Sequence, residues 1–286
     1  MDENTAMEEL DMKQMKQLAA LLLAGMMAVA LPGCTKEAGS AGSSGSGDSE
    51  TEKDTLVLGT SADYAPYEFH KIVDGKDTIM GADIQLAQRI ADDMGKELVI
   101  KDMEFGNLIT ELNNGTIDMI IAGLTPDEER AKQVDFSDIY YSGEQVCIIR
   151  KEDADKYTSP ESLAGQPVAV QTGSIFEGIV KDMMPDASVV SLPKVPDLFM
   201  QLNTGKVEAI VEGVVTANGY LAQDDSLMLA EFTIDYDEDG TAVAVQKGNT
   251  ELLEQINQTI ADVVEEGAME QWLAEAQQES QGLEEE

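Results

Sequence analysis

Short apolar segments alternate with amphipathic ones along the chain from about residue 55. Apolar, β-branched runs predict strands, and apolar residues spaced by three and four predict helices. The predicted strands are 55–59, 97–102, 117–122, 145–150, 167–171, 189–192 and 207–211. The predicted helices are 81–95, 107–114, a helix opened by Pro126, 174–182 and 197–203. Such alternation is typical of α/β units with largely parallel sheets.

Two passages of the chain share one plan. Leu112–Ile121 and Leu202–Val211 each contain a helix end, a capping glycine and an apolar strand interrupted by one acid at the same place. They lie in different halves of the body, so the pattern indicates two α/β lobes. Ligands of open α/β sheets bind beyond the carboxyl ends of the strands, so we expect a cleft where the lobes face each other.

The N-terminal 53 residues have a different composition. Lys13 and Lys16 precede an apolar run, 18–31, that is short for a membrane span and typical of a secretory signal. Leu31-Pro-Gly-Cys34 resembles the bacterial lipoprotein box, in which cleavage precedes a cysteine that carries lipid. The alternative is an ordinary buried cysteine after a signal peptide. We predict a signal peptide over 1–33, with an N-terminal extension before a start at Met12 or Met15, then a lipidated Cys34 and a Gly/Ser tether over 34–53.

The composition excludes several classes of protein. Eighteen Lys+Arg against 56 Asp+Glu give a formal net charge of −38, which argues against nucleic-acid binding. Two cysteines and one histidine exclude a Cys/His zinc cluster and a disulfide framework. We therefore predict no metal site and no cofactor.

Arg130 is a candidate anion-binding residue. It lies in the predicted helix just beyond the strand end at Thr125, where backbone N–H groups are free to bind an anion. A guanidinium can grip a carboxylate through two parallel hydrogen bonds. The alternative, which the residues alone favour, is that Arg130 pairs with Glu128 or Glu129 on a solvated helix face. Arg150, which follows a predicted strand, is expected to be an exposed loop cation.

The roles of other candidate residues also have two interpretations. Aromatic side chains after the first two predicted strands either wall an apolar pocket or pack under loops: Tyr64, Tyr67, Phe69 and Phe105. The turn from Gln171 to Ser174 leads from a strand into a helix. Gly173 there allows close backbone approach, and the Ser174 hydroxyl can cap or donate.

The ordered set of motifs resembles the polar amino-acid-binding proteins of ABC importers, solute-binding protein family 3. The passages that carry the resemblance are 59–69, 81–87, 122–125, 129–141 and 170–174. It extends over about 55–273 and implies an α/β, two-lobed periplasmic-binding-protein type II fold with two hinge strands between the lobes. By position, lobe 1 would be 54–142 plus 241–286, and lobe 2 would be 143–240.

The resemblance also implies ligand-binding roles. Arg130 and Thr125 would hold the ligand α-carboxylate, helped by the backbone near Ser174 in the turn that begins at Gln171. Tyr64 and Phe105 would wall the side-chain pocket, and Gly123 matches a residue that helps hold the α-amine. The family's amine-binding carboxylate falls at Gly213. The preceding Glu212 either takes over that role or leaves the amine held otherwise.

The implied function is capture of a polar L-amino acid for an ABC permease and its ATPase, by a monomer anchored to the outside of the bacterial cell membrane. Alternatives are a sensor working with a separate receptor chain, and a dehydratase using Glu212 and His70. We expect Glu68 and Glu212 to flank the cleft, and their negative charge favours a basic amino acid as the ligand. Glutamine is the second choice. Ser61 replaces an acid that in some relatives favours a basic side chain.

Overall fold

The computed structural model describes residues 55–234, 236 and 240–282. The predicted signal peptide, the lipidated Cys34 and the tether lie outside these residues. Within the described part of the chain, every helix is too short or too polar to cross a membrane.

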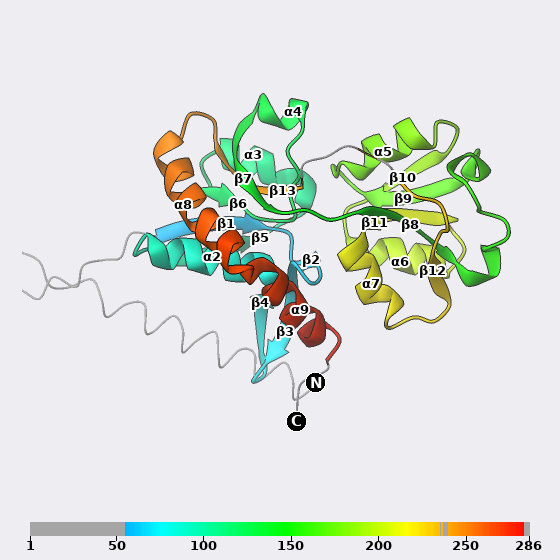
Figure 1. Cartoon of the computed structure of the whole chain (residues 1–286), viewed down its shortest axis with the longest axis horizontal. Coiled ribbons are helices and arrows are strands. Elements are labelled where there is room, and N and C mark those ends of the chain that lie inside the picture. Colours follow the sequence, from blue (N-terminus) through cyan, green and yellow to red (C-terminus); the bar gives the residue numbers. More distant parts are fainter. Residues whose placement is uncertain (1–54, 235, 237–239, 283–286) are drawn as a thin grey trace, which may run out of the picture. The chain divides into compact units, whose positions relative to one another are not determined.

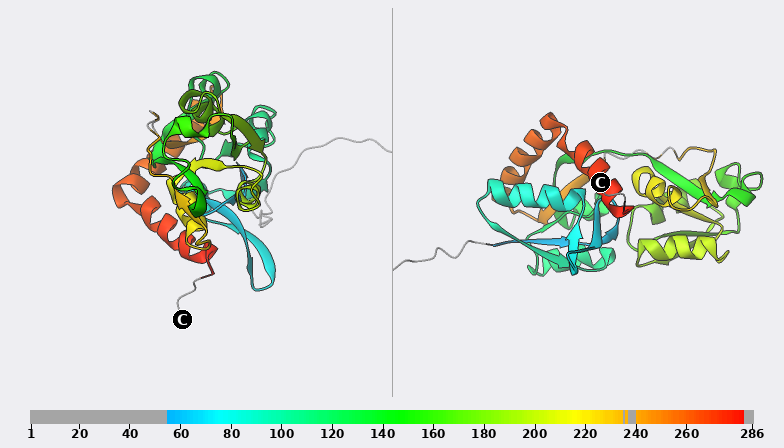
Figure 2. Two further views of the ribbon diagram at one scale, coloured as in Figure 1. Left: turned by 90° about the vertical axis from the view of Figure 1, so that its right-hand side faces the viewer. Right: turned by 90° about the horizontal axis from the view of Figure 1, so that it is seen from below.

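The first sheet has five strands in the order β5-β1-β6-β13-β7 (Figure 1). Its strands are β1 (Thr55–Thr60), β5 (Glu97–Asp102), β6 (Met119–Ile120), β7 (Val134–Tyr141) and β13 (Thr241–Gln246). β5, β1 and β6 run parallel, whereas β13 is antiparallel to both of its neighbours. The helices beside this sheet are α2 (Ala82–Asp93), α3 (Leu108–Asn113), α8 (Thr250–Glu266) and α9 (Ala268–Ser280), shown from two further sides in Figure 2.

Alternation along the strands divides the core of this sheet into two layers. Met119 and Ile121 belong to a buried cluster with α2, α8 and α9. Ile120 and Ala122 belong to a different cluster, which contains the apolar residues of α3. Successive strand residues face opposite sides of a sheet, so each face buries its own helices. The apolar run at 117–122 is therefore buried on both faces.

The second sheet repeats the plan in the order β10-β9-β11-β8-β12. Its strands are β8 (Gln145–Arg150), β9 (Pro167–Gln171), β10 (Ser188–Leu192), β11 (Ala209–Gly213) and β12 (Leu227–Leu229). Residues of α5 (Phe176–Met183) share a cluster with one face, and those of α6 (Val195–Asn203) and α7 (Val214–Leu221) with the other. Cys147 is buried in β8 and forms no disulfide within the described residues.

The chain passes from the first sheet to the second between β7 and β8, and returns between β12 and β13. The prediction of two α/β lobes is confirmed. The expectation of largely parallel sheets holds, because in each sheet four strands point the same way. One strand of each sheet, β13 or β8, is antiparallel to both of its neighbours.

The repeated passages occupy matching places in the two sheets. One forms the end of α3 and β6, and the other the end of α6 and β11. Gly115 (φ 72°) and Gly205 (φ 67°) both adopt the left-handed conformation that ends a helix. The Gly115 N–H donates to Leu112 O at 3.0 Å, and the Gly205 N–H donates to Leu202 O at 3.1 Å.

Several elements of both lobes were not predicted, among them β7, β12, β13, α7, α8 and α9. β2 (Asp63–Tyr64), β3 (Glu68–Val73) and β4 (Lys76–Met80) form a separate antiparallel sheet, and three single turns of 3₁₀ helix span Phe105–Asn107, Lys151–Asp153 and Pro160–Leu163. Several bounds also differ from the prediction, since the predicted strand 117–122 contributes only Met119–Ile120 to the ladder.

Gly81 joins β4 to α2 in a conformation that needs glycine. Its φ is 129°, and a Cβ placed there would overlap the Tyr67 carbonyl oxygen and lie 2.7 Å from the carbonyl carbon. Backbone atoms cannot move aside as a flexible side chain can. Gly81 therefore lets the hairpin pack directly on the start of α2.

We predict that Gly81→Ala lowers the free energy of unfolding by about 1–3 kcal/mol, measured by urea denaturation. Gly178→Ala is the matched control, because a Cβ at this position in α5 meets nothing within 4 Å. That control should be neutral or stabilising by up to about 1 kcal/mol. Equal effects of the two substitutions would contradict the strain assigned to Gly81.

Candidate functional site

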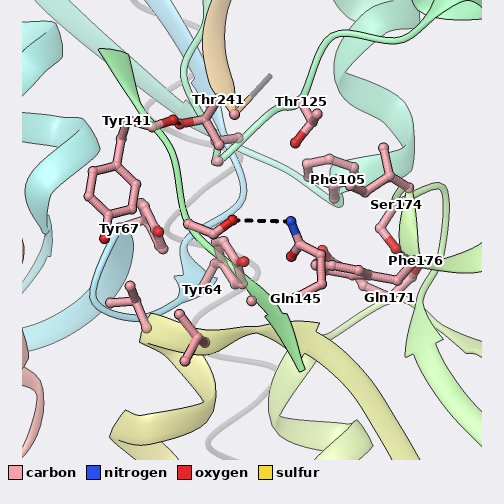
Figure 3. Close-up of a pocket in the computed structure, with 18 of the residues that line it drawn as sticks. Tyr64, Tyr67, Phe105, Thr125, Tyr141, Gln145, Gln171, Ser174, Phe176 and Thr241 are labelled. Atoms are coloured by element: carbon pink, nitrogen blue, oxygen red, sulfur yellow. Dashed lines mark hydrogen bonds between the residues drawn. The ribbon is translucent and has the colours of Figure 1, made fainter. Parts of the chain in front are cut away.

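A pocket lies between residues of the first sheet, residues of the second sheet and the connections that join them (Figure 3). Seven of the eight predicted ligand-binding residues line it: Tyr64, Phe105, Gly123, Thr125, Arg130, Gln171 and Ser174. Glu212 is not at the pocket surface, although the next residue, Gly213, is. The structure thus gathers residues that are up to 110 positions apart in the sequence, from Tyr64 to Ser174.

Arg130 belongs to a four-residue helix, α4 (Glu128–Ala131). The prediction that Pro126 opens this helix is wrong, because Asp127 is the N-cap. Its Oδ1 accepts hydrogen bonds of 2.8 Å from the backbone N–H groups of Glu129 and Arg130. An N-cap carboxylate satisfies donors that a helix cannot satisfy itself, so the helix begins at Glu128, two residues after Pro126.

The Arg130 guanidinium links the two lobes. It donates to Thr125 O at 2.6 Å and, across the pocket, to Gly173 O at 2.9 Å. Arg130 Nε lies 3.3 Å from Asp127 Oδ2, and the guanidinium carbon Cζ lies 5.7 Å from the centre of the Phe105 ring. Arg130 is only 7% exposed, so the alternative of a solvated helix face is wrong.

Tyr64 reaches the second lobe from the opposite side. Its hydroxyl donates to Glu212 Oε1 at 3.0 Å, and the Gly213 N–H donates to the same oxygen at 2.9 Å. The ring stacks on Tyr67 with centroids 5.0 Å apart. Glycine on both sides makes room for it: a Cβ at Gly123 (φ 55°) would lie 2.7 Å from Tyr64 Cε1, and one at Gly213 would lie 3.1 Å from the hydroxyl.

Glu212 is a buried acid at the end of β11. It is fully buried, and its Oε2 has no hydrogen-bond partner among the described residues. Burial raises the pKa of Glu212 to about 7, against the lowering effect of the hydrogen bonds from Gly213 and Tyr64. A buried carboxylate with one unsatisfied oxygen is suited to accept a bond from an ammonium group.

Gln171 makes a third contact between the lobes. Its Nε2 donates to Asp63 Oδ1 at 3.4 Å, while Ser174 Oγ donates to Gln171 O at 2.8 Å. Burial raises the pKa of Asp63 to about 6. Asp63 was not predicted, although it lies inside the quoted passage 59–69. The sequence offered one signal for this residue, because Asp63 is an acid directly before the aromatic Tyr64 at a chain turn.

A model of the bacterial extracellular solute-binding proteins, family 3, matches residues 56–276. The chain belongs to this family.

Its relatives include transport proteins that are similar along almost their whole length. The chain is 34% identical over 261 residues to the arginine-binding extracellular protein ArtP of Bacillus subtilis, covering 90% of this chain and 96% of ArtP. It is 29% identical over 280 residues to the ABC transporter glutamine-binding protein GlnH of the same species, covering 91% and 98%.

Solved structures are similar as well. The amino acid ABC transporter substrate-binding protein AbpA of Streptococcus pneumoniae, bound to L-arginine, matches with a TM-score of 0.76 and 35% identity, covering 81% of this chain and 97% of AbpA. An ancestral arginine-binding protein bound to glutamine matches with a TM-score of 0.69 and 35% identity, covering 77% and 96%. These matches confirm the predicted type II fold.

Other predictions for this family 3 protein need correction. Glu68 does not flank the cleft, because it is fully buried and lies outside the pocket lining. Arg150, expected to be an exposed loop cation, ends β8 and donates to Leu202 O at 3.0 Å and Val207 O at 2.8 Å. His70 lies on the hairpin at 2.9 Å from Asp77 Oδ1, and outside the pocket lining.

Several pocket residues of the family 3 protein were not predicted as ligand-binding residues. They come from the connections between the lobes and from nearby elements: Tyr67, Tyr141, Gln145, Phe176 and Thr241 (Figure 3). Tyr141 and Gln145 flank the first connection, where no local pattern indicates which side chains turn inward. Tyr67 did appear among the candidate aromatic residues.

We predict that Glu212→Gln reduces the pH dependence of stability. The raised pKa of Glu212 stabilises the fold below pH 4.5, its ordinary pKa, and this contribution is lost as pH rises through about 7. The loss in the unsubstituted protein is on the order of 2–3 kcal/mol. Urea unfolding at pH 4.5 and 8 measures it.

Glu161→Gln is the control for this experiment. A hydrogen bond from Ser159 lowers the pKa of the exposed Glu161, so this group does not titrate in that range. The control should keep the pH slope of the unsubstituted protein. If Glu212→Gln also keeps that slope, Glu212 is already ionised in the folded protein at low pH.

Proposed function

We propose that this protein captures a polar L-amino acid outside the cytoplasm and delivers it to the permease and ATPase subunits of an ABC importer. Lobe 1 would comprise 54–142 with 241–286, and lobe 2 would comprise 143–240. The division is supported by the strands, since each sheet takes all of its strands from one of these sets. We further propose that the protein acts as a monomer anchored through lipidated Cys34, without a cofactor or nucleic acid.

The observation that carries the proposal is the placement of opposite chemistry on two sides of one pocket. Arg130 is a buried cation that already binds carbonyl oxygens of both lobes. Glu212, behind Tyr64, is a buried acid with an unsatisfied oxygen. An L-amino acid presents a carboxylate and an ammonium on one carbon, which these two groups complement.

In this proposal the ligand carboxylate replaces the Gly173 carbonyl as the acceptor for Arg130. Thr125 and the backbone near Ser174 complete that end of the site, while Gly123 and Glu212 are placed for the α-amine. Tyr64 and Phe105 wall the side chain, and Gln171 contributes a polar group beside it. When the lobes close, the direct contact between Arg130 and Gly173 is replaced by a ligand that binds both lobes.

L-Arginine is the leading ligand, and glutamine is next. Asp63 and Glu212 add negative charge beside the pocket, although Ser61 provides none. ArtP and AbpA, whose names or titles specify arginine, support this order, and GlnH supports the second choice. A dehydratase is disfavoured, because His70 pairs with Asp77 and Asp102 rather than with Glu212.

We predict that Arg130→Ala abolishes binding of L-arginine measured by calorimetry. Removing the guanidinium leaves the ligand carboxylate buried without its partner, at a cost of about 3–5 kcal/mol, or at least about 100-fold in Kd. Circular dichroism should show that the fold persists. Arg130→Lys should bind weakly, since it retains charge without the two-pronged geometry.

Arg89→Ala is the matched control for Arg130→Ala. Arg89 is a surface arginine of α2 that pairs with Asp93 and Glu266, away from the pocket lining. This variant should bind L-arginine as the unsubstituted protein does. Unchanged affinity in Arg130→Ala would exclude the carboxylate role of Arg130.

We predict that a thermal-shift screen of the twenty L-amino acids raises the melting temperature most with L-arginine. A ligand at a hundredfold excess over its Kd stabilises the folded state by about 2.7 kcal/mol, which corresponds to a shift of a few degrees for a chain of this size. D-Arginine is the matched control, because it cannot place carboxylate, amine and side chain in the same three positions. A shift only with sugars or dicarboxylates would exclude the proposed substrate class.

A further inference from the structure

A second buried acidic pair lies behind the pocket, apart from Glu212. Glu68 begins β3, and Asp83 is in the first turn of α2. Both are fully buried, and neither lines the pocket. The backbone N–H of Asp83 donates to Tyr67 O at 2.9 Å, next to Glu68, and each carboxyl group shifts the pKa of the other. The binding roles assigned above do not use this pair.

The hydrogen bonds around the pair are incomplete if both acids are ionised. Asp83 Oδ2 accepts from the Gly123 N–H at 2.8 Å and from the Tyr140 hydroxyl at 2.9 Å. Asp83 Oδ1 and both oxygens of Glu68 have no such donor among the described residues. An ionised carboxylate only accepts hydrogen bonds, so two ionised groups cannot satisfy each other. One proton between them converts the contact into an O–H···O bond.

The surroundings indicate which acid holds that proton. Burial, followed by the charges of Asp83 and Asp63 and lastly that of Asp102, raises the pKa of Glu68 well above its ordinary value. Burial also raises the pKa of Asp83, but only to about 6, because the bonds from Gly123 and Tyr140 favour its ionised form. Burial, and then charges that include those of both acids, raises the pKa of the Tyr67 and Tyr140 hydroxyls. Glu68 is therefore the neutral acid.

Asp83 connects this pair to the pocket wall. Asp83 accepts a hydrogen bond from the Gly123 N–H, and Gly123 belongs to the turn that leads to Thr125. Gly123 has φ 55° and lies directly against the Tyr64 ring, with no room for a Cβ. The position of Asp83 thus affects where Gly123 meets Tyr64, while the other oxygen of Asp83, Oδ1, has no donor among the described residues.

We propose that Glu68 is a positioning residue that stays protonated and donates a hydrogen bond to Asp83, so that Asp83 holds Gly123 against Tyr64 in the binding-competent pocket. Loss of this proton places two negative charges side by side without water. The pair then separates, and the Gly123 turn loses its anchor. Ligand affinity consequently depends on a proton that does not touch the ligand.

The proton can be detected without any ligand. Infrared spectra recorded across a pH series should show the carbonyl band of a protonated carboxylic acid that persists after Asp63 and Asp83 (pKa about 6) and Glu212 (pKa about 7) have ionised. The band should disappear in Glu68→Gln. It should persist in Glu208→Gln, because Tyr157 and Arg150 lower the pKa of the half-buried Glu208 despite its desolvation. Absence of the band in the unsubstituted protein overturns the proposal.

The positioning role is tested by affinity for L-arginine, which rests on the proposed function. Glu68→Leu removes the donor and should weaken binding about tenfold, in the range expected when a buried acceptor loses its partner. Glu68→Gln should restore affinity, because its amide N–H can donate to Asp83. Glu208→Gln should bind normally, because Glu208 accepts a hydrogen bond from Tyr157 and does not line the pocket.

A pH series separates positioning from simple packing. The ratio of Kd in the unsubstituted protein to Kd in Glu68→Gln should rise as alkaline pH removes the shared proton, because ionisation of Glu212 and of the ligand affects both proteins alike. A constant ratio across a range in which the infrared band vanishes overturns the positioning role. If L-arginine binds neither protein, the proposed ligand is wrong, and the infrared result still decides whether Glu68 is protonated.

Discussion

The Tyr64 ring occupies a space that exists only because positions 123 and 213 carry no side chain. Gly123 belongs to the first lobe and Gly213 to the second, so the same ring contacts a backbone turn in each. Its hydroxyl reaches Glu212 at 3.0 Å, and its face lies on Tyr67. The pocket, the buried acid and the approach of the two lobes all meet at this close fit. A Cβ at Gly123 would lie 2.7 Å from the ring, and one at Gly213 would lie 3.1 Å from the hydroxyl.

Much of the fold could be predicted because its strongest signals are local. Alternation of short apolar runs and amphipathic helices identified most strands of both sheets, and the glycine-capped repeat identified the two lobes. The candidate site was found through residues whose chemistry is unusual in this chain. Arg130 is one of three arginines in an acidic protein, and its helix follows a strand end. The resemblance of the ordered motifs then distinguished a pocket role from a surface ion pair.

The remaining features depend on contacts between distant segments. The hairpin of β3 and β4 contains His70, Lys71, Lys76 and Asp77, so it lacks the apolar alternation that signals a strand. Arg150 was misplaced because its acceptors, the carbonyls of Leu202 and Val207, lie more than fifty residues away. Glu68 was assigned to the cleft because its charge suggests exposure. Only the packed structure shows that it is fully buried beside Asp83.

The buried position of Glu212 has a thermodynamic consequence for capture itself. With a pKa of about 7, Glu212 holds a proton in an appreciable fraction of ligand-free molecules near neutrality. An ammonium group bound beside it would favour the ionised form and lower that pKa. Capture would then expel a fractional proton into the solvent, and the measured heat of binding would include the ionisation heat of whichever buffer accepts it. Two buffers of equal pH would yield different enthalpies from the same contacts.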